Sequence, residues 1–237
     1  MMLSPRLAAL FIFCMLLSAM AIPFLQDAAA QDTTKPVIAD ITEGTPVTDG
    51  NFTVSIRVTD DYGVSTVHIY PHFIVPGGSI ILLGILMEPM PDNVYETTLG
   101  IPFNATELKY SIIAKDYSLN PESTNVITRR VWDNIPPVAA CEPTPALGMG
   151  TAHTFNGSAS TDNVGIANYT WSFVYAGNTI KLYGPHPSFN FTQAGQYSGT
   201  LAVKDAWNNS DSAPFQVTVG DTGRPGRRDC RYECRRH

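Results

Sequence analysis

An internal repeat constrains the fold of this 237-residue chain more than any other feature. Three landmarks occur twice, at offsets of 101, 102 and 89: residues 32–37 and 133–138, residues 59–64 and 161–166, and residues 114–120 and 203–208. A repeat of this kind indicates a duplicated structural unit. The offsets predict two modules of about 100 residues each, the size of an immunoglobulin-like sandwich. The smaller third offset predicts about a dozen extra residues in the first module.

Residue patterning within each module indicates β-strands. Apolar and polar residues alternate with period two over residues 52–58, as in a half-buried strand, and the same pattern covers residues 110–114, 197–203 and 215–219. No stretch keeps a helical period, and the 18 Pro and 18 Gly suit turns and edge strands. We therefore expect an all-β protein with two tandem immunoglobulin-like β-sandwiches.

The N-terminal 30 residues have the pattern of an export signal. Arg6 precedes the apolar run 7–17, and Ala28-Ala29-Ala30 is a cleavage pattern that predicts a mature start at Gln31. An uncleaved anchor is the alternative, because apolar residues continue to Leu25, although Pro23 favours cleavage. No later segment has the pattern of a transmembrane helix. The protein is expected to be secreted or on the cell surface.

Charge divides the remaining chain into an acidic body and a basic tail. Residues 31–220 hold 8 Lys and Arg against 17 Asp and Glu, whereas residues 221–237 hold six Arg against three acids. The net charge of −6 argues against a nucleic-acid partner. We expect a signal peptide at 1–30, a first sandwich at 31–132, a second at 133–220 and a disordered tail at 221–237. In that tail Cys230 and Cys234 could pair with each other, and Cys141 could pair with either of them or link two copies of the chain.

Six Asn-x-Ser/Thr sequons follow the export signal, which makes glycosylation of an exported chain plausible. Chance in an Asn- and Thr-rich β-protein is the alternative explanation. The candidate glycan sites are Asn51, Asn104, Asn156, Asn168, Asn190 and Asn208.

The second module resembles a known family. The segment 155–166 (FNGSASTDNVGI), followed by 169–173 (YTWSF), Gly195-Gln-Tyr197 and 201–205 (LAVKD), is similar to the PKD domain over about residues 134–220. One departure is 174–177 (VYAG), where the family has a Gly-Asp-Gly turn. The resemblance implies an extracellular β-sandwich that serves as a spacer or binding module. It places Trp171 in the core and Tyr197 in the core or at a corner. The first module is similar in plan, but it resembles a bacterial or archaeal Ig-like or fibronectin type III-like repeat.

A carboxylate cluster is expected at one pole of the second module. In an immunoglobulin-like sandwich the entering linker, the loop after the second strand and the loop before the last strand meet at the same end. Several carboxylates without a nearby Lys or Arg would suit Ca²⁺, which accepts irregular sets of oxygen ligands. Asp and Asn that cap turns and bind no metal are the alternative. The residues brought together are Asp133, Asp162, Asn163, Asp205 and Asn208.

The most apolar mature segment is 73–90 (FIVPGGSIILLGILMEPM), which accounts for the extra length of the first module. A pair of core strands is the favoured interpretation. An exposed hairpin that contacts a partner or a membrane surface is the alternative.

Sequence motifs of the common enzyme classes are missing, so a non-catalytic protein is expected. The expected role is adhesion, surface-layer contact or ligand presentation, with a protein or glycan at the cell surface as partner. A carbohydrate-binding accessory module of a secreted hydrolase is the alternative, with Tyr175, Tyr183 and Trp207 as stacking residues. An enzyme with a cleft between modules is a more distant rival.

Overall fold

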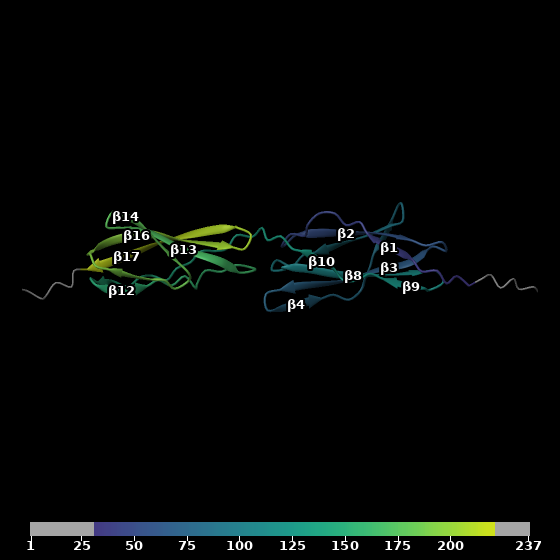
Figure 1. Cartoon of the computed structure of the whole chain (residues 1–237), viewed down its shortest axis with the longest axis horizontal. Helices are drawn as coiled ribbons and strands as arrows, with labels where there is room; N and C mark the ends of the chain where they lie inside the picture. The colour runs from purple at the N-terminus through teal and green to yellow at the C-terminus, as the bar shows by residue number, and fades with distance from the viewer. Residues whose placement is uncertain (1–30, 221–237) are drawn as a thin grey trace, which may run out of the picture. The chain divides into compact units, whose positions relative to one another are not determined.

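The computed structural model describes residues 31–220, and the predicted export signal and basic tail lie outside them. The chain divides into two units between Thr34 and Lys35, and all the strands belong to the second unit. Residues 35–220 contain the strands β1 to β17 and no helix, so the all-β prediction is confirmed (Figure 1). Two separate hydrophobic cores lie within them.

The first core lies between two antiparallel sheets. One sheet has the order β1 (Val37–Asp40), β2 (Asn51–Thr59), β7 (Val94–Gly100) and β6 (Glu88–Met90). The other has the order β10 (Ile127–Arg130), β8 (Glu107–Asp116), β3 (Val64–Val75) and β4 (Gly78–Ile81). Two short strands extend this second sheet, β5 (Ile85–Leu86) on β3 and β9 (Pro121–Ser123) on β8.

Aliphatic side chains dominate this core. The alternation predicted for residues 52–58 is confirmed in β2, where every second residue is buried. Ile56 of β2, Ile69 of β3 and Ile112 of β8 are fully buried in the same core. Burial of each such side chain is worth about 1.5–3 kcal/mol relative to exposure.

A polar tie joins the two sheets of the first sandwich. The Asp40 carboxylate on β1 accepts hydrogen bonds from the Tyr110 hydroxyl (2.9 Å) and from Nη2 of Arg129 (3.1 Å). Burial raises the pKa of Asp40, but hydrogen bonds from Thr42, Tyr110 and Arg129 outweigh burial and lower it. The ionised form of Asp40 is therefore favoured in the folded protein.

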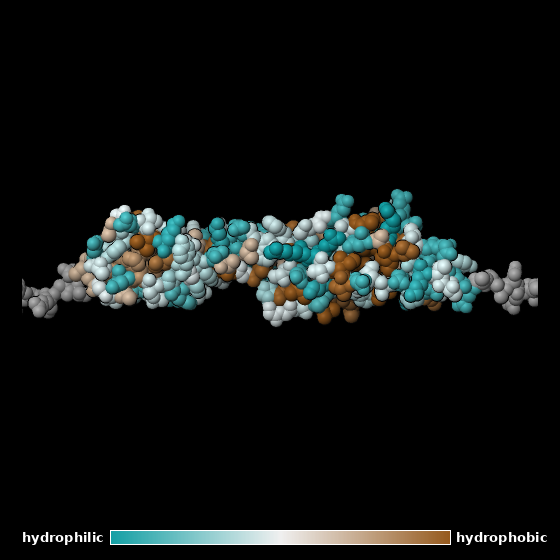
Figure 2. Space-filling model, in the orientation of Figure 1, coloured by the Kyte–Doolittle hydropathy of each residue, from teal (hydrophilic) through white to brown (hydrophobic). Residues whose placement is uncertain are grey.

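The apolar segment 73–90 departs from the core strand pair that its composition favours. Met87 is buried, yet Leu83 is 91% exposed and Ile81 is 74% exposed. The reason is topological, because β4 pairs only with β3 at the edge of its sheet and all four of its residues are exposed. Figure 2 shows hydrophobic residues gathered on this part of the surface. The exposed apolar residues here are Ile80, Ile81, Leu82, Leu83, Leu86 and Met90.

The second core lies between a five-stranded and a two-stranded sheet. The larger has the order β11 (Leu147–Gly148), β17 (Ser210–Gly220), β16 (Gly195–Asp205), β13 (Ile166–Tyr175) and β14 (Asn178–Tyr183). In it β11 runs parallel to β17 and the other neighbours are antiparallel. The smaller sheet pairs β12 (Thr151–Thr154) with β15 (Ser188–Phe191).

Aromatic rings fill this second core. Trp171 on β13 is 1% exposed, as predicted, and its Nε1 donates to the Gly184 carbonyl at 3.1 Å. Gly199 leaves room for the Phe215 ring, because a Cβ at this position would overlap that ring and lie 2.6 Å from the Ser172 carbonyl oxygen. Tyr197 is half-buried, and its hydroxyl donates to the Gln193 carbonyl at 2.9 Å.

Candidate metal centre

Three aspartates meet where the linker enters the second sandwich. Asp133 lies just after β10, Asp162 lies in the loop before β13, and Asp205 is the last residue of β16. Antiparallel pairing of β13 with β16 places Ile166 opposite Asp205, which brings the loop before β13 to the end of β16. One carboxylate oxygen from each aspartate lies within 4.8 Å of the other two.

Backbone N–H groups fix two of these carboxylates. Oδ1 of Asp205 accepts hydrogen bonds from the N–H groups of Trp207 and Asn209, both at 2.8 Å. Oδ2 of Asp162 accepts from the N–H of Val164 at 2.9 Å and of Gly165 at 2.6 Å. Both side chains thus form turn contacts that hold the carboxylate in place.

Asp133 is fully buried and only one of its carboxylate oxygens is satisfied. Oδ1 accepts from the Thr48 hydroxyl (2.9 Å), the Ile135 N–H (3.1 Å) and the Asn163 amide (3.1 Å). Oδ2 has no hydrogen-bond partner. The Asp133 main chain is held as well, because the side-chain amide of Asn209 donates to its carbonyl at 2.9 Å.

Three buried acceptor oxygens at this centre lack a donor: Oδ2 of Asp133, Oδ1 of Asp162 and Oδ1 of Asn163. Ion pairs among residues 31–220 do not relieve the charge, since they join Lys35 to Glu122, Lys109 to Glu107 and Arg129 to Asp40. An unsatisfied buried acceptor costs about 1–3 kcal/mol, and more when it is charged. A hard cation bound by oxygen ligands would remove this cost for all three atoms.

Four of the five predicted ligands come together and one does not. Asp133, Asp162, Asn163 and Asp205 surround the centre, whereas Asn208 is exposed in a turn with a φ of 70°. Asn209 takes the inner position, where its amide donates to Oδ2 of Asp205 at 2.7 Å.

The internal repeat of the sequence also points to Asn209. An offset of 89 relates Asp116 to Asp205, and the same offset relates Asn120 to Asn209. The two pairs have the same geometry, since Asn120 donates its amide to Oδ2 of Asp116, also at 2.7 Å. Strict use of the offset therefore identifies Asn209 from sequence.

The corresponding pole of the first module contains Asp60 and Asp116. Asp116 is fully buried there, like Asp205. Oδ1 of Asp60 accepts from the Tyr62 N–H at 2.8 Å, which is a turn contact like that of Asp162.

The predicted stacking residues lie in different surroundings. Tyr183 is 69% exposed, whereas Tyr175 packs against other rings and accepts a hydrogen bond from the Thr192 N–H at 2.8 Å. Tyr183 lies opposite Thr170 on β13, so Tyr175 is five residues further along that strand. This separation is roughly 17 Å at 3.4 Å per residue. Trp207 is half-buried beside Asp205.

Most predicted glycan sites face solvent. Asn51, Asn168, Asn190 and Asn208 are exposed, and Asn104 and Asn156 are half-buried. Among residues 31–220, no helix is long and apolar enough to cross a bilayer.

The comparisons with known proteins are informative mainly about the second sandwich. No curated protein matches the chain. Fibronectin(III)-like modules of Clostridium thermocellum CbhA are 11% identical, with 85% of this chain and 99% of that one covered and a TM-score of 0.32. Dimeric latent PorU from Porphyromonas gingivalis is 13% identical, with coverages of 80% and 24% and a TM-score of 0.32.

Elastase-activated Escherichia coli alpha-2-macroglobulin is 10% identical, with coverages of 80% and 22% and a TM-score of 0.35. Scores this low assign neither fold nor function. The sequence of the second sandwich is more informative, because residues 134–219 match the family model of the PKD domain.

Proposed function

We propose that this is a non-catalytic extracellular or cell-surface protein whose β-sandwiches present ligand-binding surfaces, with a Ca²⁺ ion bound by Asp133, Asp162, Asn163 and Asp205. PKD domains are typically extracellular modules, which supports the location. The observation that carries the proposal is Oδ2 of Asp133, a fully buried carboxylate oxygen without a partner beside two further carboxylates.

The donor set favours calcium over magnesium. Carboxylate and amide oxygens on a linker and two loops form an irregular set, which Ca²⁺ accepts because its coordination is flexible. Mg²⁺ demands near-ideal octahedral geometry and keeps several waters. Extracellular Ca²⁺ modules bind with a Kd of about 10⁻⁴–10⁻³ M, and binding of similar strength is expected here.

An ion at this centre would join the linker to the second sandwich. Asp133 belongs to the linker, Asp162 to the loop before β13 and Asp205 to the end of β16. Ligation by all three would restrict motion of the linker relative to these loops. A restricted linker suits a protein that presents loops and sheet faces to a protein or glycan partner, because less conformational entropy is lost on binding.

Thermal unfolding with EDTA and then with millimolar Ca²⁺ tests the proposal. At ten times Kd, a bound ion stabilises the folded state by about 1.4 kcal/mol. That corresponds to a rise in Tm of a few degrees for domains of this size. Mg²⁺ at the same concentration is expected to give a smaller rise.

Asp162→Asn removes one charge from the centre and keeps an acceptor for the N–H groups of Val164 and Gly165. It is expected to abolish the Ca²⁺-dependent rise in Tm. Asp92→Asn is the matched control, since Asp92 is exposed in a turn of the first sandwich with a φ of 61°, a conformation that Asn tolerates. An equal rise in wild type and Asp162→Asn would overturn the assignment, as would no rise in wild type.

A further inference from the structure

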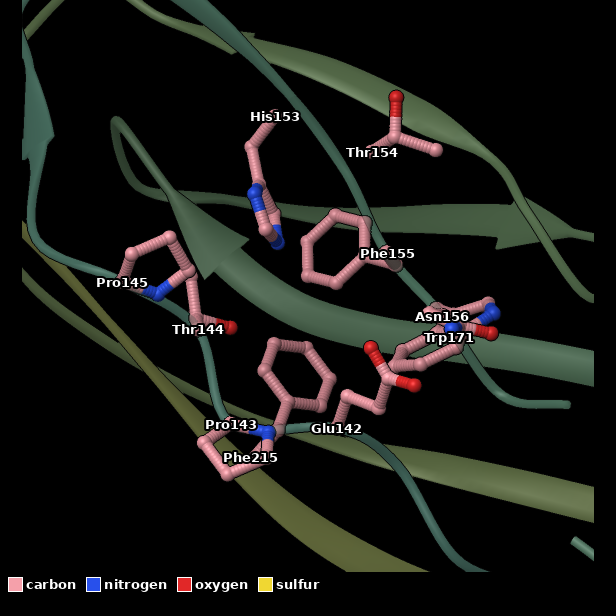
Figure 3. Close-up of a pocket in the computed structure, with 10 residues that line it drawn as sticks. All are labelled: Glu142, Pro143, Thr144, Pro145, His153, Thr154, Phe155, Asn156, Trp171 and Phe215. Carbon is pink, nitrogen blue, oxygen red and sulfur yellow. The ribbon is translucent and has the colours of Figure 1, made fainter. Parts of the chain in front are cut away.

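A cavity in the second sandwich lies apart from the carboxylate cluster. Its volume is about 280 Å³, and it opens between segment 142–145 and β12 with the residues that follow β12 (Figure 3). The two walls are tied by a hydrogen bond from the Glu142 N–H to the Asn156 carbonyl at 3.1 Å. Pockets for drug-sized ligands measure about 300–1,000 Å³, so this one suits a single side chain or a small molecule.

Three aromatic rings form the floor of this cavity. Phe155 lies 4.9 Å from Trp171 and 5.1 Å from Phe215 between ring centroids, and Trp171 lies 5.4 Å from Phe215. Phe215 is the most accessible of the three at 8% exposed. Aromatic faces carry negative electrostatic potential and attract cations within about 6 Å of the ring centroid.

One carboxylate supplies the charge of the cavity. Glu142 is the only acidic or basic residue in the lining besides His153, and Figure 3 shows its carboxylate directed toward the floor rings. Burial lowers the pKa of His153, so this imidazole is neutral at pH 7. Glu142 is exposed to solvent, and none of the ion pairs within residues 31–220 involves its carboxylate.

We propose that this cavity binds an organic cation, the guanidinium or ammonium group of an Arg or Lys side chain. The Glu142 carboxylate would pair with the cation, and the rings of Phe155, Trp171 and Phe215 would contact its apolar stem and its charged face. An anionic ligand is disfavoured because it would approach Glu142. A neutral apolar ligand would cover the carboxylate and leave it without a partner.

Such a cation has two sources, a separate peptide or the chain itself. Residues 221–237 carry six Arg and directly follow β17, the strand that supplies Phe215 to the floor. Both sources offer the same chemistry to the cavity. The test therefore compares the full chain with a chain that ends at Gly220, which keeps both hydrophobic cores.

The probes are n-butylguanidinium and n-butylammonium, with neutral n-pentanol as the control ligand. The readout is the indole Nε1–H NMR signal of Trp171, assigned by elimination with Trp132→Phe and Trp207→Phe. Both cations are expected to shift this signal in a saturable way, and pentanol is not. Glu142→Gln should weaken cation binding about two- to fivefold, since it removes a charge-assisted contact made by an exposed carboxylate.

Glu43→Gln is the matched control because it removes an exposed carboxylate of the first sandwich. It should leave the titration unchanged. If the tail occupies the cavity, the chain ending at Gly220 binds the probes more tightly than the full chain. If a separate peptide is the source, the two chains bind alike. Equal shifts with pentanol, or no shift with either cation in the shorter chain, would overturn the proposal.

Discussion

The two sandwiches of this chain stabilise similar folds with different cores. The first buries aliphatic residues such as Val54, Ile56 and Leu108, and few large rings. The second buries Phe155, Trp171 and other rings in continuous contact. The difference shows that a repeated pattern of turns and alternation sets the architecture, while the side chains that fill it can change. A ring core concentrates much of the buried area in a few residues.

This difference predicts the largest mutational effect in the second sandwich. Trp171→Ala should lower the free energy of unfolding of that sandwich by about 3–5 kcal/mol, because it opens a ring-sized cavity and leaves the Gly184 carbonyl without its donor. A conservative change in the first core, Ile56→Val, removes a single methylene and should cost about 0.5–1.5 kcal/mol. Urea unfolding followed by NMR, with the backbone amides of Ile56 and Leu201 as probes, measures both losses.

A second variant separates the lost ring from the lost hydrogen bond. Trp171→Phe keeps an aromatic ring and removes the indole N–H, so it should cost less than Trp171→Ala. The comparison of cores would be wrong if Trp171→Ala moved the Ile56 amide transition as far as the Leu201 transition. It would also be wrong if Ile56→Val cost as much as Trp171→Ala.

As the pH is lowered, the second sandwich should lose stability before the first. Burial lowers the pKa of His153, so the unfolded chain binds its proton more readily and stability falls as the pH drops below about 6.5. Hydrogen bonds from Thr42, Tyr110 and Arg129, which outweigh burial, lower the pKa of Asp40. The stabilisation from the ionised Asp40 carboxylate is fully present above the pKa of 3.8 that it has in the unfolded chain. It is lost as the pH falls through the lower pKa of the folded protein.

The same urea experiment at a series of pH values checks this order. The Leu201 transition should move to lower urea between pH 7 and pH 5, while the Ile56 transition should stay in place until below pH 4. His153→Gln should remove the early shift in the second sandwich. Asp40→Asn should remove the late shift in the first. If both sandwiches lost stability at the same pH, the pH dependence could not be assigned to His153 in the second and Asp40 in the first.

Much of this architecture was predictable because it depends on local alternation. The period-two pattern of residues 52–58 identifies both a strand and its buried face, and β2 confirms both. The burial of Trp171 was likewise predictable from the resemblance to PKD domains. Three of the aspartates gathered at one pole could be predicted because the topology of a sandwich determines which loops meet.

The sequence patterns failed at two places, a local turn and a sheet edge. Asn208 was predicted as a ligand, but the turn after β16 directs Asn209 inward and leaves Asn208 exposed. The apolar hairpin was expected in the core, yet its strand β4 lies at a sheet edge with no neighbour beyond it among the described residues. Hydropathy alone does not distinguish a buried strand from an exposed one at an edge.

The exposed hairpin gives the smallest expected change in stability. Leu83→Ser replaces a side chain that is 91% exposed, so the free energy of unfolding should change by less than about 0.5 kcal/mol. Met87→Ser, four residues further on, is the contrasting variant because Met87 is 1% exposed and should lose about 2 kcal/mol or more. Urea unfolding at the Ile56 amide compares the two. Equal costs would mean that the hairpin packs against the sandwich in solution, whereas the expected contrast would show that the large apolar side chains of this hairpin lie outside the core of the first sandwich.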